Sequence, residues 1–307
     1  MTGKTHTDSP NYGYLHSASF RLALSLAITL GFVVVEAFAG WHANSLALLS
    51  DAGHNLTDVL ALGLAWFALR LSLRPADARR SFGYHRAGIL AALINALTLA
   101  LIAGWIFYEA YQRMIHPPEV QPTILIAVGA LAVVVNLVTA LLIRRAGKND
   151  LNIRSAFIHL MGDVFSTVGA TIAGVAILFT GWNWLDPLVS VLIGGLILWA
   201  AWGVLRDTTD ILLESTPRDV HLDELVTDML KVEGVLDVHD LHVWSINKSL
   251  RTLSTHVVIE DMPISAGATV QIALNKLLAE RYEIQHATFQ LEHVCCQPGK
   301  SACNLAN

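Results

Sequence analysis

Charged residues are scarce in this sequence. Asp, Glu, Lys and Arg make up 15% of its 307 residues, whereas 54% are hydrophobic, and the mean hydropathy is +0.51. A soluble globular domain carries about 25% charged residues. The composition therefore excludes an ordinary soluble domain and indicates an integral membrane protein.

A cleavable signal peptide is also missing. The first apolar run extends from Leu22 to Gly40. That run is too long for the hydrophobic region of a signal peptide, and it lacks a small-residue cleavage site. We therefore expect the mature protein to begin near Met1.

Long apolar runs dominate the first two thirds of the chain. Six have the length of a membrane-spanning helix, at about residues 20–41, 46–70, 87–112, 120–143, 155–181 and 185–205. Lys and Arg gather in the connectors after the second and fourth runs, and the other three connectors carry none apart from Arg113 directly after the third run. Because cytoplasmic loops are enriched in Lys and Arg, both termini are predicted to face the cytoplasm.

The charge balance changes near residue 206. Up to Arg206 there are 13 Lys and Arg and 10 Asp and Glu, net +3, and from Asp207 onward there are 7 and 15, net −8. An acidic region argues against nucleic-acid binding and suits a domain exposed to cations, although a solvated acidic surface would have the same composition.

The region after residue 206 has the pattern of a small soluble domain. A helix is predicted over 219–232, strands over 235–246 and 251–260, a second helix over 265–281 and a third strand over 284–294. The predicted fold is thus an α-helical membrane protein of six transmembrane helices followed by a small α+β domain in the order α-β-β-α-β, with helices on one face of a sheet. The expected parts are a cytoplasmic N-terminal tail (1–19), a transmembrane domain (20–206), a cytoplasmic domain (207–294) and a Cys-containing tail (295–307).

Two of the apolar runs contain a histidine followed four residues later by an aspartate. These pairs are His54 with Asp58 in the second run and His159 with Asp163 in the fifth. On a helix this spacing places both side chains on one face. At about 1.5 Å per residue in a core of about 30 Å, the pairs lie at overlapping depths, roughly 10–17 Å and 7–13 Å from the cytoplasmic side. Together they offer two nitrogens and two oxygens, a natural tetrahedral set for zinc.

Isolated polar residues satisfied by neighbouring helices are the alternative interpretation. An ionised carboxylate in a membrane span costs about 2.5 kcal/mol or more, so two matched pairs favour a metal or proton site. Asp51 is expected either to accept a hydrogen bond from His54 or to line a cavity. Glu36 and Asn136 either line the same cavity or serve helix packing.

Several motifs resemble the cation diffusion facilitators, within them the zinc-transporting bacterial branch that includes ZitB and CzcD. They are SLALLSDAGHNLTD in the second run, FGYHRAGILAALINAL at the start of the third, the paired His-x-x-x-Asp motifs, and the LHVW strand. The resemblance covers the chain from about Leu22 to Glu292. It implies a homodimeric metal/proton antiporter of the bacterial inner membrane that expels Zn²⁺ from the cytoplasm.

The transport-site ligands that the resemblance implies are His54, Asp58, His159 and Asp163. Histidine at the first of these positions resembles the zinc-selective members, and imidazole favours zinc, cobalt or nickel over manganese and magnesium. Two carboxylates neutralise the dication, and after the metal leaves the same four groups should take up protons. Competition between metal and protons for one site is what exchange requires.

The resemblance also implies a cytoplasmic zinc site that regulates the dimer. Matching motif by motif gives His239, His256 and Glu292 as its ligands, with His242 or His286 close by. Solvated surface histidines are the alternative, because sequence spacing alone determines no geometry.

The cysteines lie near the C-terminus and, on the predicted topology, face the cytoplasm, so structural disulfides are not expected. Similar relatives use C-terminal cysteines together with N-terminal histidines of the partner chain as an extra metal site. Free thiols are the alternative. The residues concerned are Cys295, Cys296, Cys303, His6 and His16.

Two other function classes remain as alternatives. An intramembrane metalloenzyme of the usual kind would need His-Glu-x-x-His on one helix, and the sequence has no such string. A membrane metal sensor without transport would account for the C-terminal histidines but not for the pairs in the apolar runs. Cd²⁺, Co²⁺ and Ni²⁺ stay open as further substrates.

Overall fold

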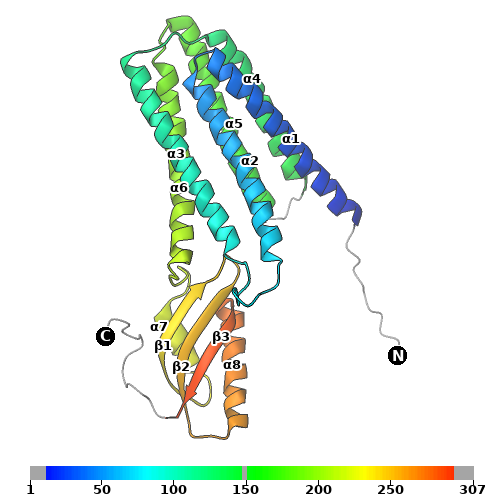
Figure 1. The fold of residues 1–307 in the computed structure, drawn as a ribbon, viewed down its shortest axis with the longest axis vertical. Helices are drawn as coiled ribbons and strands as arrows, with labels where there is room; N and C mark the ends of the chain where they lie inside the picture. Colours follow the sequence, from blue (N-terminus) through cyan, green and yellow to red (C-terminus); the bar gives the residue numbers. More distant parts are fainter. Residues whose placement is uncertain (1–11, 147–150, 294–307) are drawn as a thin grey trace. The chain divides into compact units, whose positions relative to one another are not determined.

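The computed structural model describes residues 12–146 and 151–293 (Figure 1). Contacts between residues divide the chain into two compact units. One contains the chain up to Gly63 and Ile94–Gly203, and the other contains Leu64–Leu93 and the chain from Val204 onward. Each unit is described by itself below.

Six long helices form the membrane part of the protein. They are α1 Tyr12–His42, α2 Leu46–Ser72, α3 Ala87–Ile115, α4 Pro122–Ala146, α5 Leu151–Thr180 and α6 Leu185–Leu212. Among the described residues, α3 and α6 over their full length, Pro122–Leu142 of α4 and Leu160–Thr180 of α5 are long and apolar enough to cross a membrane, and Ala27–His42 of α1 is a shorter apolar stretch. Helices α1 and α6 extend beyond the predicted apolar runs, because backbone hydrogen bonding continues through polar residues at helix ends.

Helices α4 and α5 pack along each other, and α1 packs on α4. Glycines permit the close approach of α4 and α5. A Cβ atom at Gly129 would lie 2.5 Å from Oγ1 of Thr171, and one at Gly174 would lie 2.9 Å from Cγ of Leu125. Membrane helices commonly use small residues in this way, because there is little hydrophobic drive to hold them together. The glycines thus bring the backbone of α5 close to its neighbour.

A buried carboxylate from α6 anchors the start of α2. Asp186 accepts a hydrogen bond of 2.5 Å from the Ser45 hydroxyl and one of 2.6 Å from the backbone N–H of Leu46. The first N–H groups of a helix have no partner within the helix, so this carboxylate satisfies donors that would otherwise be orphaned. It therefore sets where α2 begins.

The α+β domain has the predicted order. Its elements are α7 Leu222–Met229, β1 Val235–Ser245, β2 Arg251–Ile259, α8 Ile264–Tyr282 and β3 Ile284–Glu292. The strands lie in the order β1-β2-β3, with β1 antiparallel to β2 and β2 parallel to β3, so α8 is the crossover between parallel strands (Figure 1). Leu225 of α7, Leu253 of β2 and Leu274 of α8 are fully buried in one core.

A hydrogen bond joins the two helices of this domain. Asp228 of α7 accepts a hydrogen bond of 2.7 Å from the Tyr282 hydroxyl at the end of α8 and pairs with Lys231 at 2.8 Å. These donors lower the pKa of Asp228, and burial next to that carboxylate raises the pKa of Tyr282 to about 12. The hydrogen bond between Asp228 and Tyr282 therefore connects α7 to the end of α8.

Candidate metal centres

Two membrane helices bring three potential ligands together. His54 and Asp58 lie one turn apart on α2, and Asp163 lies on α5. The Nε2 atom of His54 is 3.2 Å from Oδ1 of Asp163 and 3.7 Å from Oδ2 of Asp58. The three ligand atoms all lie within 4.8 Å of one another, a spacing that one metal ion can bridge. The sequence predicted these three residues to meet.

The fourth predicted ligand is His159. It lies on α5, four residues before Asp163, so helical geometry places it on the same face of α5. Its side chain lies outside the described part of the structure, and its participation stays a prediction.

A buried polar network surrounds this group. The amide of Asn55 donates to Oε2 of Glu36 at 3.3 Å. Oγ1 of Thr167 lies 3.0 Å from Oδ2 of Asp51, and the amide of Asn136 donates to Oγ1 of Thr167 at 3.4 Å. The network links side chains of α1, α2, α4 and α5, and all five are at most 4% exposed.

Asn55 and Thr167 were not singled out from the sequence. A signal was nevertheless present, because Asn55 follows His54 directly and Thr167 lies one helical turn after Asp163. Uncharged polar residues are common in membrane helices for packing reasons, so that signal is weak without the structure.

The donor set of the membrane cluster fits zinc. One imidazole and two carboxylates are ligands that zinc accepts, and the two negative charges balance a dication. Without a cation, two ionised carboxylates in a membrane interior are costly. The arrangement is therefore suited to a site that always holds either a metal ion or protons.

The second cluster lies on the sheet of the α+β domain, where strand register places its members. His239 of β1 is directly opposite His256 of β2, and His256 is opposite Gln290 of β3. Glu292 lies two residues beyond Gln290 and so points to the same face of the sheet. Residues far apart in the sequence thus converge.

The distances in this cluster suit a metal ion. Nε2 of His239 is 3.4 Å from Oε2 of Glu292, and Nδ1 of His256 is 3.0 Å from Oε1 of Glu292. The ligand atoms of all three lie within 4.8 Å of one another. His239 and Glu292 are buried, while His256 is partly exposed. Two imidazoles and a carboxylate supply three of the four ligands of a tetrahedral zinc site.

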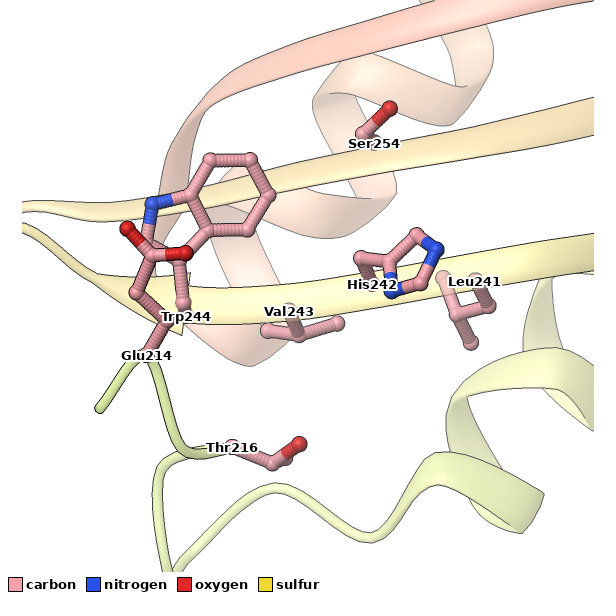
Figure 2. Close-up of a pocket in the computed structure, with 7 residues that line it drawn as sticks. All are labelled: Glu214, Thr216, Leu241, His242, Val243, Trp244 and Ser254. Atoms are coloured by element: carbon pink, nitrogen blue, oxygen red, sulfur yellow. The ribbon is translucent and has the colours of Figure 1, made fainter. Parts of the chain in front are cut away.

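The two histidines expected nearby have different surroundings. His242 projects from β1 on the same side as Trp244, over a cavity of about 380 Å³ whose lining also includes Glu214 and Ser254 (Figure 2). His286 is exposed at the start of β3 and is not in the three-residue cluster. Cys295, Cys296, Cys303, His6 and the His16 side chain lie outside the described residues.

Comparisons with known proteins cover both parts of the chain. The family model described as the cation efflux transmembrane domain matches residues 22–213, and the model described as the cation efflux protein cytoplasmic domain matches residues 217–294.

Individual relatives are similar over nearly their whole length. The chain is 38% identical to the cadmium, cobalt and zinc/H(+)-K(+) antiporter of Bacillus subtilis, over 90% of this chain and 92% of that protein. It is 37% identical to the metal cation efflux system protein CzcD of Cupriavidus metallidurans, over 92% and 89%, and 36% identical to zinc transporter ZitB of Escherichia coli, over 90% and 88%. A solved structure of the metal-bound C-terminal domain of the CzcD transporter is 33% identical, covers 24% of this chain and 99% of that one, and has a TM-score of 0.22.

Proposed function

The chain belongs to the cation efflux family, and from that premise we propose that it exports Zn²⁺ from the cytoplasm in exchange for protons by alternating access. The observation that carries this proposal is the convergence of His54, Asp58 and Asp163 between two membrane helices. A site inside the membrane part, built from the ligand types that zinc prefers, is what a zinc carrier needs. His159 is the fourth ligand.

Proton exchange follows from the chemistry of the same ligands. Zinc binds imidazole in its neutral form and carboxylate in its ionised form, so each bound metal ion displaces protons. When zinc leaves toward the outside, the bare groups bind protons again and carry them inward. The name of the Bacillus subtilis relative, an antiporter of cadmium, cobalt and zinc, supports exchange and extends the substrate range to Cd²⁺ and Co²⁺. Ni²⁺ is a further substrate on ligand chemistry alone.

The protein acts as a homodimer in the bacterial inner membrane, with both termini in the cytoplasm. The family model matched by residues 217–294 is named ZT_dimer, which supports assembly through the α+β domain. The concentration of Lys and Arg in two connectors supports the orientation. In this orientation the second cluster faces the cytoplasm.

The cytoplasmic cluster of His239, His256 and Glu292 binds zinc as a regulatory ligand. Its support is the meeting of three ligands on one sheet face, with Glu292 buried between two imidazoles. Zinc binding there would report the cytoplasmic zinc concentration to the transporter.

Zinc-driven proton flux in proteoliposomes tests the transport site. His54→Ala and Asp163→Ala each remove one ligand, so we expect each variant to lose the flux while remaining dimeric. Glu119→Gln is a matched control, because Glu119 is an exposed acid in the connector between α3 and α4. Undiminished flux in either ligand variant would refute the assignment, and a protein that binds zinc but moves none would be a sensor.

A further inference from the structure

The backbone of strand β1 is irregular directly after His239, a member of the second cluster. The pairing of β1 with β2 shifts register between His239 and His242, and Asp240 within this interval has a φ of 50°. This left-handed backbone region is unfavourable for most residues, but Asp and Asn tolerate it better than others. Strained positions of this kind often occur where a side chain must be aimed at a functional site.

The carboxylate of Asp240 lies between two histidine rings. Its Oδ1 atom is 3.0 Å from Nε2 of His242, and its Oδ2 atom is 3.5 Å from Nε2 of His256. Two imidazole contacts hold one carboxylate in place. The Asp240 carboxylate therefore lies at Nε2 of His256, whereas Glu292 lies at the other ring nitrogen.

His256 consequently has a carboxylate at each ring nitrogen. Nδ1 is 3.0 Å from Glu292, and Nε2 faces Asp240. A neutral imidazole carries one N–H, and the other nitrogen offers a lone pair. With the proton on Nε2, the lone pair of Nδ1 points to the side where Glu292 and His239 lie, which is the metal position.

We propose that Asp240 is a positioning residue for the cytoplasmic metal site. It accepts a hydrogen bond from Nε2–H of His256, so that His256 binds zinc through Nδ1. The inference rests on the proposed zinc binding by His239, His256 and Glu292. The carboxylate behind a metal-bound histidine selects its tautomer, orients its ring and raises its basicity, and loss of such a partner weakens metal binding by about 10- to 100-fold.

Zinc titration of the full-length protein against a chelating dye tests this role. All proteins in the test carry His54→Ala and Asp163→Ala, so that the membrane site does not contribute. Asp240→Asn keeps the side-chain shape and the tolerance for positive φ but removes the charge, and we expect zinc affinity to fall by about 10- to 100-fold. Asp237→Asn, which removes a charge from the same strand, should bind as the parent does.

The outcomes separate the two proposals. Parent-like affinity in Asp240→Asn overturns the positioning role and leaves the zinc site intact. Parent-like affinity in His239→Ala shows that zinc binds elsewhere and overturns both proposals.

A second measurement is made on the parent protein and uses a variant only to assign a signal. In the zinc-loaded parent labelled with ¹⁵N-histidine, nuclear magnetic resonance identifies the protonated ring nitrogen, and His256→Asn assigns the signal. The proton is expected on Nε2 of His256. A proton on Nδ1, with zinc on Nε2, overturns the inference.

Discussion

In the proposed membrane site, His54 and Asp163 would have different tasks. The imidazole of His54 lies 3.2 Å from the Asp163 carboxylate, although the two residues are on different helices. Carboxylates balance the charge of a dication, whereas imidazole selects for borderline-soft metals such as zinc. We therefore expect metal selectivity and charge balance to depend on different side chains and to change separately on substitution.

A substitution at His54 tests this division. His54→Asp replaces the nitrogen ligand by a hard oxygen ligand, so we expect the ratio of zinc to manganese transport to fall by about tenfold or more, which corresponds to about 1.4 kcal/mol. Competition between Zn²⁺ and Mn²⁺ in one proteoliposome assay measures the ratio. His116→Asp, a change at an exposed histidine in the connector after α3, should leave it unaltered. An unchanged ratio in His54→Asp would show that selectivity lies elsewhere.

At the scale of elements, α2 is fixed at its start and carries two candidate metal ligands further along. The carboxylate of Asp186 at the start of α6 binds Ser45 and the first N–H groups of α2. About two and three turns further along, His54 and Asp58 lie close to Asp163 of α5. A contact at the first residues of α2 thus fixes the start of the helix that carries the two candidate ligands.

Loss of that contact should weaken the bundle. Asp186→Ala removes the acceptor for donors that are buried, and removal of a helix cap costs about 0.5–2 kcal/mol. We expect a lower unfolding temperature in detergent, measured by circular dichroism, with a smaller decrease for Ser45→Ala, which removes only one of the donors. Glu119→Gln serves as the control. An Asp186→Ala protein as stable as the parent would contradict the capping role.

At the scale of the whole molecule, the order of elements could be predicted from the sequence. Apolar length identified the six helices, and alternation with turn residues identified the three strands, because both signals are local in the chain. The pairs His54 with Asp58 and His159 with Asp163 were visible for the same reason, since helical spacing is local too.

The contacts between distant residues could not be predicted in this way. Thr167 meets Asp51 because α5 packs beside α2, and no local pattern encodes that packing. Asp240 is aimed at His256 by a register shift and a positive φ in β1, which binary alternation does not anticipate. The sequence therefore predicts the candidate ligands more readily than the residues that contact and orient them.

Uphill zinc transport distinguishes a zinc/proton exchanger from a passive zinc carrier. Proteoliposomes hold an acidic lumen, with equal free Zn²⁺ on both sides at the start. Because protons and zinc compete for one site, protons leaving the lumen should drive zinc into it, and a protonophore should abolish the accumulation. We expect accumulation by the parent and none by Asp163→Ala. Zinc that moves only down its own gradient in the parent, or that accumulates equally in Asp163→Ala, would contradict it.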